Sequence, residues 1–420
     1  MDSARAGVDA RVRRYYAFQM LVAFQLWSPF WSLWLFDRLK YDFFQATLVD
    51  VVFWIVSLLV AMPAGAIADR YGRKRALLIG VALWIAGIVL FGLATTFGTF
   101  ALANAVWGFG AGFLWGTGSA YLYDTLMEVR LEARYPAMSS RVAMFSFLGT
   151  AMAAAIGGVV VWFTQRFELT LILYAIPAGI AFVFALTFQE PIVPREPAPS
   201  LFAQIASGLR TTRGNRQIVL VIVFQVLVGL VTYVMGFFRP AFIDDVVQKN
   251  YALMGFVYAG FFIVAAIAGR LVDTLLKRFG ESGMLALTFL LVFPPFAVVY
   301  AISANLFAAS LALVLGVLTQ VSFYIVWGIE GPVITTILNR RIGSGDRATV
   351  LAISSFFSTL VIAITEPVVG ILATDYDLGV GLAVLAFATS IPTAYVLLAY
   401  RRSESGAPQG AAAAAAVRER

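Results

Sequence analysis

The sequence predicts an all-α membrane protein with twelve transmembrane helices, arranged as two related six-helix bundles. Of its 420 residues, 61% are hydrophobic and only 13% are charged, whereas a soluble domain carries about 25% charged residues. Twelve apolar runs are long enough to cross a bilayer, which takes roughly 20 residues in a helix. Short segments of the first half of the chain are echoed in the second half, which predicts the division into two bundles.

Each predicted span is a run of mostly apolar residues. The first run follows Arg11, Arg13 and Arg14, but it is too long and too rich in tryptophan for a cleaved signal peptide. Only the short segment TTFGTF separates the third run from the fourth. The predicted spans are 15–36, 45–68, 76–96, 100–124, 141–163, 170–189, 217–240, 251–273, 284–302, 306–334, 348–372 and 380–400.

The basic residues predict the orientation of these spans. With the N-terminus in the cytoplasm, five of the 30 Lys and Arg residues fall on the outer side and the other 25 on the cytoplasmic side. This asymmetry follows the positive-inside rule and places both termini in the cytoplasm. It also explains the net charge of +7 by contacts with anionic lipid, without a nucleic-acid partner. The outer basic residues are Arg38, Lys40, Arg166, Arg239 and Lys249.

The chain divides into two bundles joined by a linker. We expect an N-terminal bundle at 1–189, a proline-rich cytoplasmic linker at 190–216 and a C-terminal bundle at 217–400. The alanine-rich segment 401–420 is expected to be a disordered cytoplasmic tail.

The two bundles carry matching segments. AGAIAD at 64–69 is echoed by AGRLVD at 268–273, so that Gly65 and Asp69 have counterparts in the second half. Arg141, which opens the fifth span, matches Arg347, which opens the eleventh. Two matches at nearly one offset indicate duplicated halves, a layout that is common among transporters.

A charged loop, ADRYGRKR (68–75), interrupts the apolar sequence between the second and third spans. Gly65 permits close approach of a neighbouring helix, and Asp69 lies one turn later on the same face. Gly72 allows a sharp reversal of the chain, after which Arg73 points back towards the bundle. Since an acid adds nothing to membrane topology, Asp69 indicates a contact with the positive N-terminus of a neighbouring helix.

The motif Gly65-x-x-x-Asp69-Arg70-x-Gly72-Arg73-Lys74 resembles the signature loop of the major facilitator superfamily. Twelve spans, two halves and a weaker copy at 269–278 extend the resemblance over the whole chain. It implies that Asp69 engages the start of the eleventh helix and that Arg73 pairs with an acid ending the fourth. Such a clasp would hold the halves together at the cytoplasmic side while the cavity opens outward. The predicted switch residues are Gly65, Asp69, Arg70, Gly72, Arg73, Asp124, Asp346 and Arg347.

The resemblance also implies a substrate cavity lined by the first, fourth, seventh and tenth helices. Amide and aromatic side chains recur at helical spacing on these four helices. Because an unpaired amide in hydrocarbon is costly, we expect the amides to face a polar cavity suited to an amphipathic or aromatic solute. Some tryptophans could instead pack against helices or form an interfacial belt. The candidates are Gln25, Trp27, Trp31, Asn104, Trp107, Trp115, Gln225, Tyr233, Gln320, Tyr324 and Trp327.

Three acids lie within the predicted spans: Glu366, Glu330 and Asp50. The chain has no His and no Cys, so a proton carried inside the protein is expected to ride on a carboxylate or, less simply, on Tyr or Lys. Intramembrane acids are functional hypotheses by default. Two structural alternatives stay open, in which Glu366 pairs with Arg239 and Asp50 pairs with a basic residue of an outer loop.

The sequence contains no nucleotide-binding loop, metal-ligand cluster or nucleophile–base pair, so we predict neither an enzyme nor a cofactor. We predict a monomeric secondary transporter of the bacterial cytoplasmic membrane, which works by alternating access and exports amphipathic or aromatic molecules with proton coupling. The alternatives are a proton-coupled importer of a nutrient such as a sugar or organic acid, and a transport-dead membrane sensor. AAAIGG (153–158) lacks the Gly-Pro pair that proton antiporters of the superfamily often carry, whereas EPVVG (366–370) places a related sequence in the eleventh span.

Overall fold

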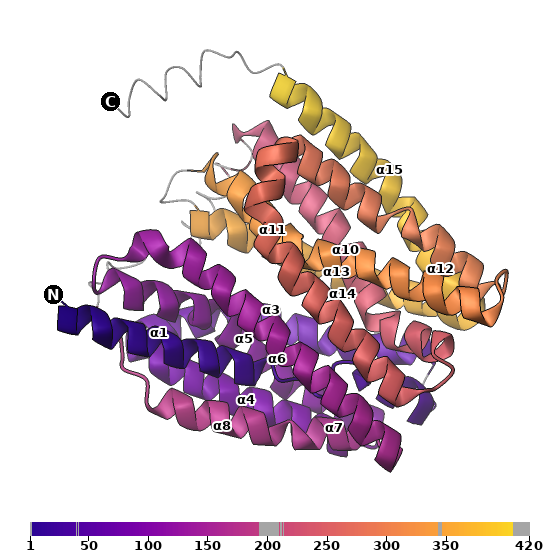
Figure 1. The fold of residues 1–420 in the computed structure, drawn as a ribbon, viewed down its shortest axis with the longest axis horizontal. Coiled ribbons are helices and arrows are strands. Elements are labelled where there is room, and N and C mark those ends of the chain that lie inside the picture. The colour runs from indigo at the N-terminus through magenta and orange to yellow at the C-terminus, as the bar shows by residue number, and fades with distance from the viewer. Residues whose placement is uncertain are drawn as a thin grey trace.

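A computed structural model shows a bundle of long helices that run along one axis (Figure 1). It describes residues 2–38, 40, 42–192, 210, 212, 214–342 and 347–405, and no strand occurs among them. The elements of the N-terminal half are α1 (Asp2–Val22), α2 (Trp31–Leu33), the π-helix η1 (Trp34–Arg38), α3 (Phe43–Tyr71), α4 (Arg73–Leu93), α5 (Phe97–Met127), the 3₁₀-helix η2 (Glu132–Arg134), α6 (Tyr135–Thr164), α7 (Glu168–Leu173) and α8 (Ala175–Leu186). Those of the C-terminal half are α10 (Arg216–Val246), α11 (Tyr251–Val292), α12 (Pro295–Ser303), α13 (Ala309–Asn339), α14 (Arg347–Asp375) and α15 (Leu378–Ser405).

Ten helical stretches of the described residues are long and apolar enough to cross a membrane. One of them, Tyr251–Ser303, includes α11, in which the chain reverses at Gly280, and it therefore supplies two of the predicted spans. The first predicted span is absent from the ten because its helix is broken. With that span and the divided stretch, the twelve predicted spans are accounted for.

The prediction of one continuous first helix over 15–36 is wrong. α1 ends at Val22, and helical structure returns only at Trp31. The break frees backbone carbonyls, and hydroxyl groups of neighbouring helices bind two of them: Tyr174 donates to the Val22 oxygen and Thr150 to the Ala23 oxygen, each at 2.7 Å. Broken helices are tolerated at membrane depth when side chains satisfy the freed backbone groups in this way.

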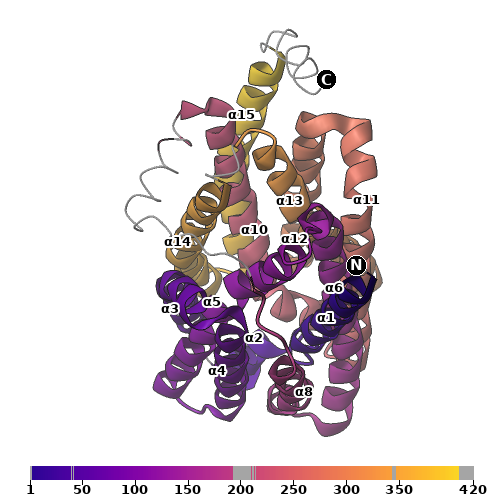
Figure 2. The same cartoon turned by 90° about the vertical axis from the view of Figure 1, so that its left-hand side faces the viewer.

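The two halves form separate groups of helices that meet along two seams (Figures 1 and 2). α3 packs against α14 along one seam, and α6 packs against α11 along the other. We call the end of the bundle that holds the α3–α4 connection, the start of α1 and the end of α15 the inner end, and the opposite end the outer end.

Near the outer end, the backbones of the two halves touch through glycine. A Cβ atom on Gly255 of α11 would lie 2.6 Å from the Cα atom of Gly158 of α6. A Cβ atom on Gly370 of α14 would lie 2.8 Å from Thr47 Oγ1 of α3. Small residues allow helix backbones to approach closely within a membrane, so both seams are tight at the outer end.

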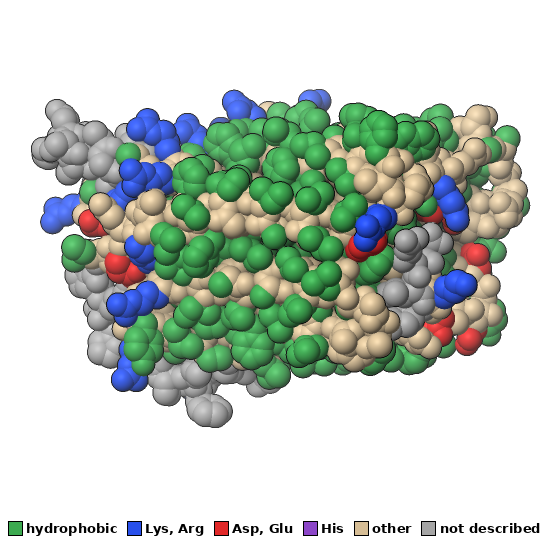
Figure 3. All heavy atoms as spheres, turned by 90° about the horizontal axis from the view of Figure 1, so that it is seen from below, with side chains coloured by type: hydrophobic (Ala, Val, Ile, Leu, Met, Phe, Trp, Pro, Cys, Tyr) green, Lys and Arg blue, Asp and Glu red, His purple; other side chains and the backbone are tan. Residues whose placement is uncertain are grey.

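The surface has the pattern of a membrane protein. Figure 3 shows hydrophobic side chains over the middle of the molecule and a concentration of Lys and Arg towards one end. Large apolar side chains such as Leu59, Phe163 and Phe387 are more than two-thirds exposed, and exposed apolar surface of this extent indicates contact with lipid. The protein is an integral membrane protein.

Parts of two predicted regions lie outside the described residues. These parts are 193–209 of the linker and 406–420 of the tail. The last helix, α15, continues to Ser405, which is five residues past the predicted end of the C-terminal bundle.

Candidate functional site

A cavity of about 540 Å³ lies between the two halves near the middle of the bundle. Its volume is typical of a small-molecule site. Its wall comes from the broken segment after α1 and from α2, α3, α4 and α5 of the N-terminal half, and from α10, α11 and α13 of the C-terminal half. Seven of the nine tryptophans of the chain line it: Trp27, Trp31, Trp54, Trp84, Trp107, Trp115 and Trp327.

The cavity is closed towards the outer end by packed aromatic rings. Trp31 of α2 lies edge-on to Phe237 of α10 with 5.2 Å between ring centroids, and Phe43 of α3 meets Phe238 of α10 at 5.5 Å. Each of these contacts joins one half to the other. The outer access route is therefore blocked by side chains of both halves.

Towards the inner end the lining side chains become accessible. Trp107 of α5 and Tyr324 of α13 are buried, but Trp115 and Trp327, which lie further along the same helices towards the inner end, are 53% and 50% exposed. Since all four residues line the cavity, the described residues form a conformation that is closed outside and open to the inner end.

Most of the predicted cavity residues do line the cavity. Tyr233 of α10 is among them, and two of the predicted acids, Asp50 and Glu330, join them in the wall. The predicted residues found in the wall are Gln25, Trp27, Trp31, Trp107, Trp115, Tyr233, Tyr324 and Trp327.

Three of the predicted amides are not among the lining residues, contrary to prediction. Asn104 donates to the Val49 carbonyl at 2.8 Å and so ties α5 to α3. Gln225 accepts a 2.7 Å hydrogen bond from Ser354 and ties α10 to α14. The third amide, Gln320, accepts from a guanidinium described below. Burial of an amide requires a polar partner, and a neighbouring helix meets that requirement as well as a ligand does.

Asp50 joins the two halves at the cavity wall. Its Oδ2 atom accepts hydrogen bonds from the Tyr233 hydroxyl at 2.5 Å and from Trp54 Nε1 at 3.0 Å. Asp50 and Trp54 lie on α3, whereas Tyr233 lies on α10. Asp50 is only 4% exposed, so the carboxyl group forms a polar link between the halves in a largely apolar surrounding. Among the side chains that the structure describes, no basic residue of an outer loop pairs with it.

Glu366 of α14 lies beside this link and is fully buried. It is close enough to Asp50 for the two carboxyl charges to interact. Neither carboxyl oxygen of Glu366 has a hydrogen-bond partner among the described residues. The two acids thus face each other across the α3–α14 seam, with no basic side chain paired to either in the described part of the chain.

Arg239 was counted with the outer basic residues and falls at the end of the predicted span 217–240, but the helix continues seven residues beyond it, to Val246. Arg239 lies within α10, is 6% exposed and lines the cavity. Its Nε atom donates to Gln320 Oε1 at 2.8 Å, and its guanidinium carbon lies 4.6 Å from the centre of the Tyr324 ring. The alternative pairing of Glu366 with Arg239 is therefore not formed.

The charged loop at the inner end forms what we call the N-terminal corner, made by Asp69, Arg73, Asp124 and Glu190. The expected contact is present, with Arg73 Nε donating to Asp124 Oδ2 at 3.1 Å, and Arg73 also pairs with Asp69 at 2.8 Å. Glu190, which the sequence did not single out, accepts from the backbone N–H groups of Arg73 and Lys74 at 2.6 and 2.8 Å. Glu190 thereby caps the N-terminus of α4.

One feature of the predicted switch, the helix approach at Gly65, is not found. Another, the contact of Asp69 with the eleventh helix, involves residues outside the described part of the chain. No atom of the described residues lies within 4 Å of the position that a Cβ atom on Gly65 would take, so the expected close helix approach is not seen in the described part of this conformation, which is open at the inner end. Asp346 and the side chain of Arg347 lie outside the described residues, and the contact of Asp69 with the eleventh helix stays a prediction. Arg70 lies over the ring of Tyr71 at 5.4 Å.

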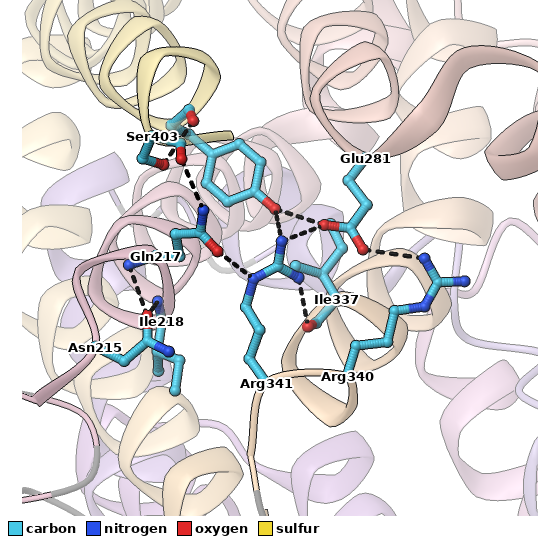
Figure 4. Close-up of polar contacts among 9 residues, drawn as sticks. Asn215, Gln217, Ile218, Glu281, Ile337, Arg340, Arg341 and Ser403 are labelled. Carbon is cyan, nitrogen blue, oxygen red and sulfur yellow. Dashed lines mark hydrogen bonds and ion pairs between the residues drawn. The ribbon is translucent and has the colours of Figure 1, made fainter. Parts of the chain in front are cut away.

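A second polar cluster, the C-terminal corner, lies at the inner end of the other half (Figure 4). Glu281 follows the reversal at Gly280 and accepts from Arg340 at 3.0 Å, from Arg341 at 2.5 Å and from the Tyr400 hydroxyl at 2.7 Å. Arg341 also donates to Gln217 at 2.8 Å. Burial works to lower the pKa of Arg341, but its hydrogen bond with Glu281 raises that pKa above the usual range. The cluster ties the inner ends of α10, α13 and α15 to the reversal within α11.

Comparison with known families agrees with this architecture. The profile of the Major Facilitator Superfamily matches residues 16–366. The chain belongs to the major facilitator superfamily. Members of this superfamily are transporters, and the predicted twelve-helix fold with two six-helix halves is confirmed.

Curated superfamily relatives match short parts of the chain. The drug efflux pump JefA of Mycobacterium tuberculosis (strain ATCC 25618 / H37Rv) is 31% identical over 102 residues, which cover 24% of this chain and 20% of that protein. Multidrug resistance protein 3 of Bacillus subtilis (strain 168) is 26% identical over 110 residues, which cover 26% of this chain and 22% of that protein. The chain thus matches about a fifth of the length of each relative.

Solved superfamily structures match over almost the whole chain at low sequence identity. A point mutant of the nucleoside transporter NupG superposes with a TM-score of 0.77 at 15% identity, covering 93% of this chain and 99% of that one. A bacterial homologue of the human lysosomal transporter Spinster, inward-facing and unoccupied, gives a TM-score of 0.67 at 14% identity and covers 95% and 96%. At such identities these structures establish the fold alone.

Sequence reasoning missed several lining residues, of which three carry the argument below. Trp54 and Tyr258 line the cavity from α3 and α11, helices outside the four that were searched. Arg239 was counted with the outer basic residues and placed near the outer end of the predicted span 217–240, but it was not named as a cavity residue, although it lies inside the apolar segment GFFRPAF. A single Arg flanked on both sides by apolar residues is a usable signal, because a charge in that setting is expensive and rarely accidental.

Proposed function

We propose that the protein is a proton-coupled secondary transporter that exports small amphipathic or aromatic molecules. The observation that carries the proposal is the cavity between the halves, in which seven tryptophans surround a few polar groups. Aromatic walls bind flat, apolar solutes by stacking and burial, and a site between two halves can be exposed to either side in turn. The drug-efflux names of the curated relatives agree with this direction of transport.

Asp50 and Glu366 are the proposed proton carriers. Two buried carboxylates side by side repel each other and lack the solvation that charge requires, so the two acids together are expected to hold a proton in the closed seam. When the outer end opens, α3 and α14 separate, and each carboxyl group meets water alone. Protonation and opening of the seam are thereby coupled, because the Asp50–Tyr233 link joins the same two halves.

The test uses inside-out membrane vesicles with an acidic lumen and a lumenal pH dye. Planar aromatic solutes and sugars are added separately, and a substrate of an exporter should release lumenal protons. We expect aromatic solutes to raise the lumenal pH and sugars to have no effect. Proton movement driven only by a sugar or an aliphatic organic acid would favour the nutrient importer, and no response to any solute would favour a sensor.

Variants identify the proton carriers in the same assay. Asp50→Asn and Glu366→Gln should each abolish solute-driven proton movement. Asp375→Asn is the matched control, because Asp375 is an exposed acid on the same helix as Glu366. A Glu366→Gln protein that still accumulates the solute against its gradient would remove Glu366 from the mechanism.

A further inference from the structure

Arg239 gives the aromatic cavity a positive charge that a substrate has to match. Its side chain is 6% exposed, lies at the cavity wall and makes no ion pair with any acid among the described residues. A guanidinium keeps its charge inside a protein, whereas a buried carboxyl group can become neutral by taking up a proton. The permanent charge of this cavity is therefore positive.

The surroundings hold the guanidinium in place without neutralising it. Gln320 accepts from Nε, and the ring of Tyr324 lies against one face of the group. Both contacts are made by neutral side chains, so the Nη atoms keep donors available. A Cβ atom on Gly236 would lie 3.8 Å from Nη1, and Gly236 itself lines the cavity. The absence of a side chain there leaves this edge of the guanidinium accessible to a ligand.

The polar groups beside Arg239 include hydrogen-bond donors, and Asp244, which also interacts electrostatically with Tyr258, makes no ion pair with Arg239 among the described residues. The hydroxyl of Tyr258, a lining residue that interacts electrostatically with Arg239, has no hydrogen-bond partner among the described residues. The Nε2 donor of Gln320 is likewise unpartnered and buried. Of these two groups only the Tyr258 hydroxyl belongs to a lining residue, and it lacks the partner that a buried polar group normally has.

The described acids near Arg239 make other contacts and do not pair with its guanidinium. Asp50 already accepts two hydrogen bonds, from Trp54 and Tyr233. Glu330 lines the cavity from α13 and is half-buried, and its Oε1 atom lies towards Gly229 of α10. Asp244 follows Arg239 on α10 but is not among the lining residues. None of these acids forms an ion pair with the guanidinium.

We propose that the cavity binds an organic anion, with the aromatic body of the substrate against the tryptophans and its carboxylate on Arg239. This inference rests on the proposed function and narrows the substrate to aromatic or amphipathic acids. A planar guanidinium matches a carboxylate with two parallel hydrogen bonds.

The experiment compares three probes that share one ring system and differ in charge: 1-naphthoate, 1-naphthamide and 1-naphthylmethylamine. Dissociation constants are measured by calorimetry on the purified full-length protein at neutral pH. We expect 1-naphthoate to bind about tenfold more tightly than the amide, as a charge-assisted contact implies, and the protonated amine to bind most weakly. This comparison needs no variant, so it does not depend on the folding of an altered protein.

Variants then assign the preference to Arg239. Arg239→Gln should bring the affinities for the acid and the amide to the same value, and Arg239→Lys should keep part of the difference, since it keeps the charge but loses the planar fork. Arg166→Gln is the control, because Arg166 is an exposed residue paired with Glu168 away from the cavity. It should leave all three constants unchanged.

The outcomes separate this inference from the proposed function. Equal or tighter binding of the amide or the amine overturns the anion assignment and leaves the aromatic site standing. An acid preference that survives in Arg239→Gln also overturns it. Binding of none of the three probes overturns both the anion assignment and the aromatic exporter.

Discussion

In the N-terminal corner the acid is Asp124 at the end of α5, and the guanidinium is Arg73, which follows the chain reversal at Gly72. In the C-terminal corner the order is exchanged, since the acid Glu281 follows the reversal at Gly280 and the guanidinium is Arg341 after α13. Both reversals use a glycine with positive φ, 106° and 67°. The duplicated halves thus share backbone geometry and carry opposite charge patterns.

The two corners also differ in how completely their charges are paired. Glu281 accepts from three donors of its own half and its side chain is 10% exposed. Asp69 contacts Arg73, yet its side chain is 49% exposed at the inner surface. A saturated cluster stabilises one bundle, whereas an accessible acid can engage the other bundle when the inner end closes. The comparison predicts that the C-terminal corner serves stability and the N-terminal corner serves switching.

The largest effect is expected for transport by Asp69→Asn. Loss of a contact that stabilises the inner-closed conformation by a few kcal/mol changes the ratio of the two conformations by about 100-fold. We therefore expect Asp69→Asn to lose most of the rate of solute transport. Asp273→Asn is the control at the matching position of the second half, where the acid is exposed and makes no ion pair among the described residues. Membrane insertion of both variants is checked by their yield in purified membranes. Equal transport by the two variants would contradict the asymmetry.

For stability, substitutions in the C-terminal corner should have larger effects than substitutions in the N-terminal corner. Glu281→Gln removes the charge that three donors share, so the free energy of unfolding in detergent should fall by about 2 kcal/mol. Asp124→Asn loses one ion pair with Arg73, and about 1 kcal/mol is expected. The measurement is denaturant unfolding followed by tryptophan fluorescence. A larger loss for Asp124→Asn than for Glu281→Gln would reverse the assignment of roles.

Substitution of either reversal glycine, Gly72 or Gly280, by alanine should lower the free energy of unfolding, but by different amounts. Both have φ and ψ values that are almost exclusive to glycine, and alanine is expected to cost about 1–2 kcal/mol at either position. A Cβ atom on Gly72 would also lie 2.8 Å from the Glu190 carboxyl group, whereas the same atom on Gly280 meets nothing within 4 Å. Gly72→Ala should therefore destabilise the protein more than Gly280→Ala in the same unfolding assay.

The smallest effect is expected for the cap of α4. Glu190→Ala leaves the N–H groups of Arg73 and Lys74 without their acceptor, which should lower the free energy of unfolding by about 1 kcal/mol. Glu190→Gln retains an acceptor oxygen and should lose less. If both variants unfold like the unaltered protein, the cap contributes nothing to stability in detergent.

The fold could be predicted from the sequence because its cause is local and repeated. An apolar run of the right length can satisfy its backbone in lipid only as a helix, so twelve such runs gave twelve spans without knowledge of any contact. The broken first span is the exception. Its turn depends on hydroxyl groups of Thr150 and Tyr174, which belong to helices far along the chain.

The cavity was predicted less completely, for a similar reason. Helical spacing places Trp107 and Trp115 on one stripe of α5, and both line the cavity. The same reasoning placed Asn104 there as well, but its amide is bound to Val49 of α3. Whether a buried polar side chain meets a ligand or a neighbouring helix depends on what packs against it, and spacing along one helix carries no such information.

The sequence by itself determined the membrane class, the twelve spans and the duplicated halves, because these follow from hydrophobicity, charge and repeated segments. The contact of Arg73 with Asp124 was implied by the resemblance of the charged loop to the family motif. Tertiary structure alone decided that Asp50 and Glu366 face each other, that Arg239 lies at the cavity without a counter-charge, and that Glu281 joins Arg341 and Tyr400. These relations link helices distant in sequence. The physical reason is that the energy of a buried charge is set by all the groups around it, and packing brings those groups together from both halves of the chain.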